Sequence, residues 1–254
     1  KEIKFKEFYK YALANNFDFI ATGHYVNTDH KNLYKGLDVT KDQSYFLHAI
    51  DKEVLSQSLF PLGKVKKEKV REIARSNNLI TSEKKDSTGI CFIGERPFPE
   101  FIGSYLEGEP GNIVDERGEV IGTHPGLVFY TLGQRQGLGI GGVKGAADLP
   151  WYVAKKDLTN NELMCVQGNE HPLLFSNELS TKNLFLLDDT LPNSFDGTAK
   201  VRYRQRDQEC KIFIENDKMK IVFKEPQRSV TPGQSVVIYN KDKCLGGGEI
   251  KTIN

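Results

Sequence analysis

The residues before and after Cys91 follow different patterns, and this change limits the folds that the chain can adopt. Upstream, apolar residues recur at helical spacing, and a buried strand follows a helix. Downstream, glycines, prolines and turn dipeptides are frequent, long helical periodicity is absent, and the pattern is β throughout from about residue 170. The sequence therefore predicts an α/β segment followed by all-β parts.

The first 25 residues have the layout of an open α/β sheet. Residues 1–16 predict an amphipathic helix, and residues 17–21 form an apolar run of strand length that ends just before Gly23. The apolar helical face carries Phe5, Phe8, Tyr9, Ala12 and Leu13. Ligands bind at the carboxyl ends of the strands in such sheets, so Gly23 could let the backbone approach a nucleotide. An ordinary turn glycine fits the position equally well.

Two further helices are expected before Cys91. One lies within residues 41–60, where Asp42 or Ser44 could cap it, and the other spans about residues 66–78. The second region carries the cations Lys64, Lys66, Lys67, Lys69, Arg71 and Arg75. Such a run is either a solvated helix face or a track for a phosphate backbone, and the sequence leaves both interpretations open.

Turn signals divide the later part of the chain into short strands. Residues 116–118 predict a hairpin between strands at 111–115 and 119–122, and residues 160–161 predict another between 151–155 and 162–166. Further strands are expected at 198–206, 209–215, 218–223, 234–240 and 244–253. Their close spacing predicts a small barrel or sandwich.

Residues 137–142, Gly-Leu-Gly-Ile-Gly-Gly, match the G-x-G-x-x-G expression of dinucleotide sites. Such a site needs a strand before the glycines and a helix after them. Here Gln-Arg-Gln precedes the motif, and the residues that follow it end at Pro150. We interpret the motif as a flexible loop that either faces a substrate or connects two elements.

The composition of the 254 residues suits two modest domains or three small ones. Because 35 Lys and Arg balance 34 Asp and Glu, any RNA contact must come from local patches of charge. No apolar run reaches membrane-spanning length and no signal peptide is evident, which predicts a cytoplasmic protein without a membrane partner. The start at Lys1, without an initiator methionine, is typical of the middle of a larger protein.

The four cysteines are Cys91, Cys165, Cys210 and Cys244. None is spaced as C-x-x-C and no histidine pair completes a zinc site, so no metal site is expected. Four cysteines could form two disulfides, but thiols stay reduced in a cytosolic chain. Cys165, Cys210 and Cys244 lie in apolar or strand-like surroundings and are expected to be structural.

Cys91 lies in a run of small and turn-prone residues, between glycines and just after Lys84 and Lys85. Neighbouring cations lower the pKa of a thiol, and glycines let a bulky partner come close. These features fit a reactive thiolate. A buried cysteine acting as a small hydrophobe between Ile90 and Phe92 fits the same stretch.

Several motifs in combination resemble one family. They are residues 21–25 (ATGHY), 41–47 (KDQSYFL), 86–98 around Cys91, 130–135 (YTLGQR), 202–205 (RYRQ), 230–235 (VTPGQS) and 245–248 (LGGG). Their combination and order resemble the tRNA-specific 2-thiouridylases, the MnmA or TrmU family, nearly from end to end.

The resemblance implies an α/β fold, the remainder of an ATP-pyrophosphatase domain with a Rossmann-like sheet, over residues 1–96. A small central tRNA-binding domain over residues 97–168 and an all-β barrel over residues 169–254 would follow. It also implies an enzyme that replaces the C2 oxygen of the wobble uridine by sulfur in the tRNAs for Lys, Glu and Gln. ATP, with Mg²⁺, would adenylate that oxygen, and a cysteine desulfurase or a sulfur-relay protein would supply the persulfide.

The family's functional positions map onto this sequence. Cys91 matches the cysteine that carries the persulfide, and Gly23 matches a position near the nucleotide. The positions that match tRNA contacts are His24, Lys41, Asp42, Gln43, Arg202, Tyr203 and Gln234. Arginine and lysine can pair with phosphates, tyrosine can stack on an unpaired base, and glutamine can bond a base edge or a sugar. Tyr203 could also be a core residue, and Gln234 a turn residue.

The chain departs from the family pattern near its start. The expected glycine- and serine-rich phosphate loop and a second catalytic cysteine in an Asn-Pro-Asp stretch are not found in this sequence. We therefore expect this polypeptide alone to be inactive, which single-turnover thiolation of unmodified tRNA with ATP and a persulfide donor would test. The alternative is a tRNA-binding, sulfur-accepting module that works with a separate ATPase chain.

Overall fold

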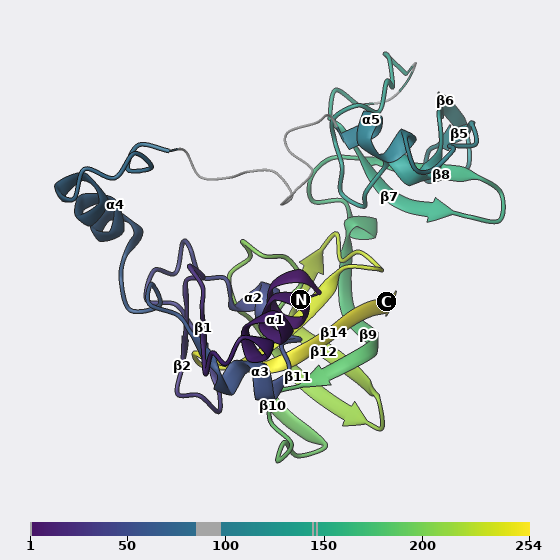
Figure 1. Ribbon diagram of the computed structural model, residues 1–254. Helices are drawn as coiled ribbons and strands as arrows, with labels where there is room; N and C mark the ends of the chain where they lie inside the picture. Colours follow the sequence, from purple (N-terminus) through teal and green to yellow (C-terminus); the bar gives the residue numbers. More distant parts are fainter. Residues whose placement is uncertain (1, 85–97, 144, 146) are drawn as a thin grey trace. The chain divides into compact units, whose positions relative to one another are not determined.

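The computed structural model describes residues 2–84, 98–143, 145 and 147–254. Cys91 lies outside these residues. The contacts of the chain divide it into two compact units. Unit 1 comprises residues 1–85, 177–225 and 232–254, and unit 2 comprises residues 86–176 and 226–231. The N-terminal α/β part and the C-terminal barrel thus belong to the same unit, although the central part separates them in sequence (Figure 1).

The N-terminal part of unit 1 consists of helical segments and very short strands. Its elements are η1 (Ile3–Phe8), α1 (Tyr9–Ala14), β1 (Ile20–Ala21), β2 (Val26–Thr28), β3 (Leu33–Lys35), α2 (Ser44–Leu47), α3 (Lys52–Ser56), β4 (Ser58–Leu59) and α4 (Lys67–Ser76). The helix expected over residues 1–16 is confirmed by η1 and α1, which bury Phe5, Tyr9 and Ala12. β1 pairs with β4 in parallel, with Ile20 opposite Ser58, as an open α/β sheet requires.

The region 41–60 forms two short helices rather than one. Neither Asp42 nor Ser44 is the N-cap residue of α2, since that position belongs to Gln43. The Asp42 carboxylate nevertheless accepts a hydrogen bond from the backbone N–H of Ser44 at 3.1 Å and so satisfies an N–H group of the first turn.

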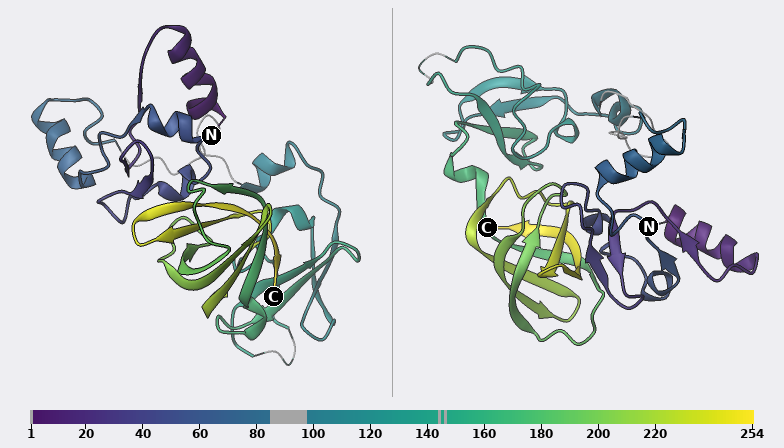
Figure 2. Two further views of the ribbon diagram at one scale, coloured as in Figure 1. Left: turned by 90° about the horizontal axis from the view of Figure 1, so that it is seen from below. Right: turned by 90° about the vertical axis from the view of Figure 1, so that its left-hand side faces the viewer.

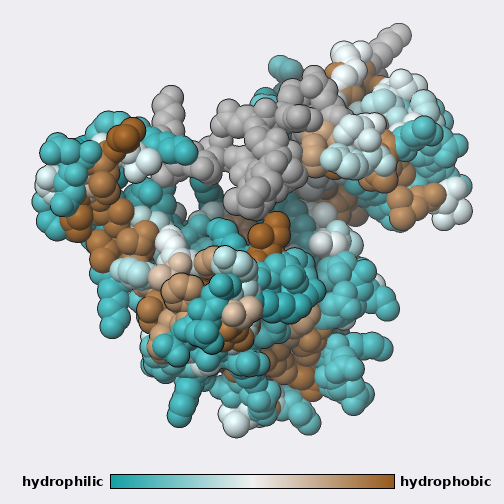
Figure 3. Space-filling model, viewed as in Figure 1, coloured by the Kyte–Doolittle hydropathy of each residue, from teal (hydrophilic) through white to brown (hydrophobic). Residues whose placement is uncertain are grey.

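α4 confirms the helix expected near residues 66–78, but it has no buried residue. Ile73 on its apolar face is 47% exposed. Hydrophobic and hydrophilic residues both show on the surface of this segment (Figure 3). Some cations of the region pair locally, such as Lys69 with Glu72 at 2.7 Å and Arg75 with Glu83 at 2.6 Å.

Six strands at the C-terminal end form a closed barrel, seen in green to yellow in Figure 2. They are β9 (Phe175–Leu186), β10 (Ser194–Lys200), β11 (Gln208–Glu215), β12 (Lys218–Arg228), β13 (Ser235–Asn240) and β14 (Lys243–Ile253). They follow the order β13-β10-β11-β12-β9-β14, and the pairing of β13 with β14 closes the ring. The barrel confirms the first of the two architectures expected for this region.

The barrel and the N-terminal part share one sheet and one core. The hairpin of β2 and β3 extends the barrel sheet from β14, with Leu33 opposite Cys244. Ile20, Leu33 and Leu55 pack in the same buried cluster as Val237 and Cys244. This shared core fixes the position of α2 relative to the barrel, because Tyr45 and Leu47 belong to the cluster.

The strand expected over residues 198–206 is wrong in its second half. β10 ends at Lys200, and residues 201–207 form a loop before β11. The backbone N–H of Val201 donates to the Gln205 side chain at 2.8 Å, and the N–H of Gln205 donates to the Arg202 carbonyl at 3.1 Å. These local bonds take the place of ladder bonds, so the chain turns instead of extending.

Unit 2 contains a four-stranded sheet with the order β6-β5-β8-β7. Its elements are α5 (Phe98–Gly103), β5 (Gly111–Val114), β6 (Val120–His124), η2 (Leu127–Phe129), β7 (Trp151–Asp157), β8 (Glu162–Gln167) and η3 (Pro172–Leu174). Both expected hairpins are confirmed: β5 pairs with β6 and β7 with β8. The structure assigns neither a helix nor a strand to residues 137–142, as expected for a loop.

Candidate nucleic-acid interface

The short helix α2 and the residues before it connect the segments that were expected to contact tRNA. The backbone N–H of Gln43 donates to the Tyr25 carbonyl at 3.1 Å, and the N–H of Tyr25 donates to the Gln43 side chain at 3.0 Å. The Tyr45 hydroxyl donates to the Ser235 carbonyl at 2.7 Å. The Phe46 ring lies 4.4 Å from the ring of Tyr203.

Four segments that are far apart in sequence therefore lie around one helix. They contain the expected positions His24, Lys41, Asp42, Gln43, Arg202, Tyr203 and Gln234. All of them belong to unit 1. The structure brings the expected tRNA-contact positions together, and their contacts with RNA stay predictions.

Asp42 is the most deeply buried of these positions, with 5% of its surface exposed. Its carboxylate accepts hydrogen bonds from the backbone N–H groups of Gly36 and Ser44, each at 3.1 Å, and from the Ser44 hydroxyl at 2.9 Å. The Lys200 ammonium lies 3.7 Å from the same carboxylate. Donors of this chain thus surround the Asp42 oxygens. This arrangement indicates that the Asp42 side chain stabilises the local structure before α2.

The other positions are more accessible. Arg202 is exposed, and Lys41, Gln43 and Gln234 are half-buried. Tyr203 is also half-buried, and its ring lies 6.4 Å from Tyr45 in addition to its contact with Phe46. An aromatic ring held by others while partly exposed is a suitable platform for an unstacked base.

His24 is half-buried between aromatic rings, 5.5 Å from Phe5 and 6.4 Å from Phe60. One ring nitrogen, Nδ1, shares a hydrogen bond with the Thr22 hydroxyl at 2.9 Å. Burial and the nearby Lys4 charge lower the pKa of His24 to about 4. The imidazole is consequently neutral at pH 7 and can offer a hydrogen bond but no positive charge.

Gly23 is exposed and follows β1 at the carboxyl edge of the parallel pair. A Cβ atom at this position would meet only Leu62, at an ordinary 3.7 Å, so packing does not demand a glycine. A cavity of about 380 Å³ lies at the end of the neighbouring strand β4, and Phe60, Pro61 and Lys64 are among its lining residues. A nucleotide contact at Gly23 stays a prediction.

A group of charged side chains that the sequence motifs did not indicate holds the C-terminal end of the loop 201–207. Lys35 pairs with Asp207, and Lys200 lies 3.6 Å from the same carboxylate. Both ammonium groups lie over the ring of Tyr239, at 4.4 and 5.4 Å from its centroid. No spacing rule signals these residues, because they come from β3, β10, a loop and β13.

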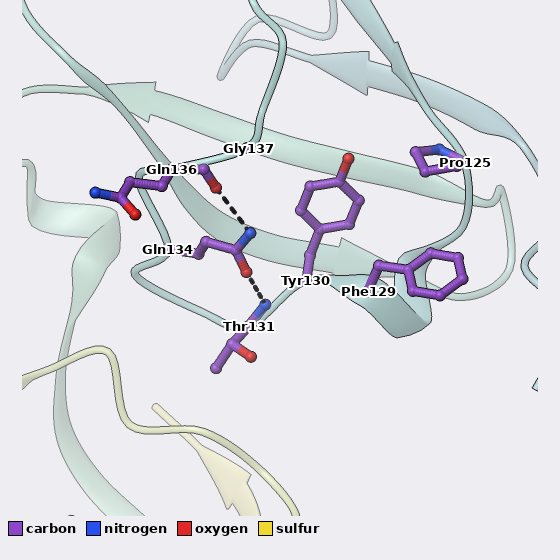
Figure 4. Close-up of a pocket in the computed structure, with 7 residues that line it drawn as sticks. All are labelled: Pro125, Phe129, Tyr130, Thr131, Gln134, Gln136 and Gly137. Carbon is purple, nitrogen blue, oxygen red and sulfur yellow. Dashed lines mark hydrogen bonds between the residues drawn. The ribbon is translucent and has the colours of Figure 1, made fainter. Parts of the chain in front are cut away.

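Unit 2 contains a cavity of about 880 Å³ at the 130–135 motif, shown in Figure 4. Its lining residues are Pro125, Phe129, Tyr130, Thr131, Gln134, Gln136 and Gly137. The Gln134 side chain accepts a bond from the Thr131 backbone N–H at 3.0 Å and donates to the Gln136 carbonyl at 2.9 Å. The side-chain amide of Gln134 therefore stabilises the conformation of this loop.

The cysteines within the described ranges are free and buried. Burial raises the pKa values of the Cys165, Cys210 and Cys244 thiols to about 12. Within the part of the chain that the structure describes, no group of His, Cys, Asp and Glu could hold a metal ion. No helix among those residues is long and apolar enough to cross a membrane.

Three protein families match consecutive parts of the chain. Residues 1–95 match a family described as the tRNA methyl transferase HUP domain, and residues 99–167 match the tRNA methyl transferase PRC-barrel domain. Residues 176–250 match the aminomethyltransferase beta-barrel domain. The order agrees with the expected α/β, central and β-barrel parts, and the exact division at residues 96 and 168 stays a prediction.

Curated relatives extend this similarity over almost the whole chain. A protein of Francisella philomiragia named tRNA-specific 2-thiouridylase MnmA is 53% identical over 257 aligned residues, which cover 98% of this chain and 72% of the relative. The chain belongs to the MnmA/TrmU family. Proteins of the same name from two subspecies of Francisella tularensis, tularensis and holarctica, are 54% identical with the same coverage of both chains. The resemblance found in the motifs of this MnmA-family chain is thereby confirmed.

Proposed function

We propose that this MnmA-family chain serves the 2-thiolation of the wobble uridine in the tRNAs for Lys, Glu and Gln. The observation that carries the proposal is the 53% identity to a named tRNA-specific 2-thiouridylase over 98% of the chain. The clustering of the candidate contact segments around α2 also supports it, because these segments lie close enough to one another to contact one RNA.

The proposed chemistry exchanges one atom of the base. The C2 oxygen attacks the α-phosphate of ATP, and pyrophosphate leaves. Mg²⁺, bound with the nucleotide, would neutralise part of the phosphate charge.

The terminal sulfur of a Cys91 persulfide then attacks C2, and AMP leaves with the original oxygen. A second thiol, which the resemblance assigns to a cysteine not found in this sequence, then attacks the Cys91 sulfur, breaks the S–S bond and leaves the transferred sulfur on C2. In the alternative order the second thiol attacks first and releases sulfide, which attacks C2; in both orders the two thiols end as a disulfide that a thiol reductant must reopen. A cysteine desulfurase or a sulfur-relay protein would load Cys91. Gly23, at the exposed edge of the β1–β4 pair, is the proposed contact of this chain with the nucleotide.

The charges of the two units support tRNA binding by unit 1. Unit 1 contains 28 Lys and Arg against 22 Asp and Glu, whereas unit 2 contains 7 against 12. The excess of cations in unit 1 attracts a polyanion, and tRNA binding by the central part over residues 97–168 stays a prediction that would depend on local patches of charge. In the proposed interface Arg202 and Lys41 bind phosphates and Tyr203 stacks on an unpaired base. Gln43, Gln234 and neutral His24 offer hydrogen bonds to bases or sugars, and Asp42 holds their segment in place.

Filter binding of an unmodified transcript of the tRNA for Glu tests the interface. We expect Arg202→Ala to weaken binding about tenfold, because a hydrogen bond to a charged group contributes about 1.5 kcal/mol. Lys182→Ala is the matched control, since this barrel lysine pairs with Glu249 at 2.8 Å and lies in none of the contact segments. Equal affinities of wild type and Arg202→Ala would contradict the proposed interface.

A further inference from the structure

We propose that Lys35, Lys200, Asp207 and Tyr239 are positioning residues that hold the loop 201–207 against α2 in the arrangement that binds tRNA. The inference rests on the proposed function, and it assigns a role to residues that are not themselves proposed contacts with RNA. It also gives Asp42 a place in the same network.

The charges of the network alternate in sign. Lys35 pairs with Asp207, Lys200 lies 3.6 Å from Asp207, and Lys200 lies 3.7 Å from Asp42. The exposed fractions of the side chains are 10% for Lys35, 11% for Lys200, 33% for Asp207 and 3% for Asp42. The two ammonium groups and the Asp42 carboxylate are deeply buried and need oppositely charged partners, so removing the charge of the more exposed Asp207 is costly because it leaves the two lysines less compensated.

Tyr239 connects α2 and the two lysines of the network to the barrel. It is fully buried on β13, and its hydroxyl lies 3.2 Å from the hydroxyl of Ser44, the first residue of α2. Its ring lies under both lysine ammonium groups. A cation over an aromatic face is attracted by the ring, most strongly where water is excluded. The same residue thus fixes the start of α2 and the cations that hold Asp207.

The loop between β10 and β11 depends on these contacts because it lacks regular structure. Lys200 and Asp207 lie at its two ends and are brought together by their ion pair. Between them, the Gln205 side chain accepts a bond from the Val201 N–H, and Tyr203 packs on Phe46. A loop ordered before binding loses less conformational entropy when RNA binds, so its order contributes to affinity without any contact to RNA.

Asp207→Asn tests the inference, because the substitution keeps the shape of the side chain and removes its charge. The added net positive charge would by itself favour a polyanion, so weaker binding must come from the loop. We expect it to weaken binding of the tRNA transcript about fivefold and to speed up amide hydrogen exchange in residues 201–207. Tyr239→Phe, which removes only the hydroxyl beside Ser44, is the second variant, and we expect a smaller loss of about twofold. The matched control is Asp188→Asn, since Asp188 pairs with Lys243 at 2.6 Å in the same barrel but contacts no loop residue named above.

A mutant cycle that combines Asp207→Asn with the double substitution Arg202→Ala/Tyr203→Ala separates positioning from general stability. If the network acts through the loop, Asp207→Asn has little further effect in an Arg202→Ala/Tyr203→Ala background, because that background lacks both proposed RNA contacts of the loop. The slope of log K against log salt should also become shallower in Asp207→Asn, as in Arg202→Ala, because a phosphate contact is lost. A loss of folded protein alone would lower the amount bound and leave this slope unchanged.

The inference is overturned if Arg202→Ala weakens binding while Asp207→Asn and Tyr239→Phe do not, or if Asp207→Asn weakens binding as much in the Arg202→Ala/Tyr203→Ala background as in wild type. The proposed function fails in a different way, when wild type and Arg202→Ala bind the transcript equally. Urea unfolding of each variant establishes that the binding measurements compare folded proteins.

Discussion

At the scale of single residues, burial makes the thiols of the described cysteines unreactive. Cys165, Cys210 and Cys244 are held in apolar surroundings, and their raised pKa values leave almost no thiolate at neutral pH. Sequence analysis identified them as structural from the apolar residues on either side. The thiol proposed to carry sulfur, Cys91, is the remaining cysteine of the chain.

We expect iodoacetamide at pH 7.5 to alkylate Cys91 at least tenfold faster than the other cysteines of the native protein. The reason is that only a thiolate attacks, and the buried thiols are protonated. Peptide mapping by mass spectrometry at several reaction times measures the rates, and the same reaction in urea is the control in which the differences should shrink. Equal rates at all four cysteines of the native protein would contradict the expectation.

His24 gives a prediction about pH. A lowered pKa means that the unfolded chain binds a proton on this residue more readily than the folded chain, so its contribution to stability is complete above pH 6.5 and is lost as the pH falls towards 4. We expect the free energy of unfolding to fall between pH 7 and pH 5 by about 2 kcal/mol more in wild type than in His24→Gln. Urea unfolding at both pH values measures this difference. Equal pH dependence of the two proteins would show that His24 titrates normally.

At the scale of elements, the glycines of β14 allow the barrel to close beside α2. Gly246 has a φ of +130°, and a Cβ atom there would overlap the Phe185 carbonyl and lie 2.9 Å from the Cα of Leu186. A Cβ atom at Gly247 would overlap the Val236 carbonyl and lie 2.8 Å from the His48 ring. Both strands next to β14 therefore approach it too closely for a side chain.

We expect Gly246→Ala to lower the free energy of unfolding by about 3 kcal/mol, since backbone strain and overpacking act together. Gly142→Ala is the control, because no atom lies within 4 Å of its added Cβ atom and the expected change is below about 0.5 kcal/mol. The midpoints of urea unfolding compare the variants. A Gly246→Ala protein as stable as Gly142→Ala would contradict the close approach of β14 to β9.

Local signals predicted some elements well and others poorly. The hairpins of unit 2 were predicted correctly because their turns contain residues that favour positive φ. Gly118 and Asn161 are two of them, and both adopt positive φ in the structure. The strand 198–206 was overextended because alternating polar residues resemble an exposed strand, while the bond from Val201 to Gln205 that turns the chain depends on a side chain. β4 was missed because its two residues owe their conformation to pairing with β1.

At the scale of the whole molecule, motifs identified the family and most residues of the candidate site. They could not predict the charged residues that hold the loop of this site in place. His24, Lys41, Arg202 and Gln234 were found because they stand in motifs whose order resembles the family. Lys35 and Lys200 stand in no such motif, and 165 positions separate them in the sequence. Their shared partner Asp207 becomes evident only when the barrel has folded against β3.

The opposite charges of the units predict which cations drive tRNA binding. The affinity should fall steeply with salt, and Arg202→Ala should make the slope of log K against log salt shallower by about 0.7 for one lost phosphate contact. Arg117→Ala in unit 2 is the control, because Arg117 already pairs with Asp115 and Glu119, each at 2.9 Å. The same change of slope in both variants would contradict a specific phosphate contact at Arg202.

The 2-thiouridine content of tRNA from cells that carry Cys91→Ser in the encoding gene tests the proposed function most directly. Cys210→Ser is the matched control, since it alters a buried thiol in the same way. Mass spectrometry of the digested tRNAs for Lys, Glu and Gln should show that 2-thiouridine is lost with Cys91→Ser and retained with Cys210→Ser. Normal 2-thiouridine in the Cys91→Ser cells would contradict the role of this chain in sulfur transfer.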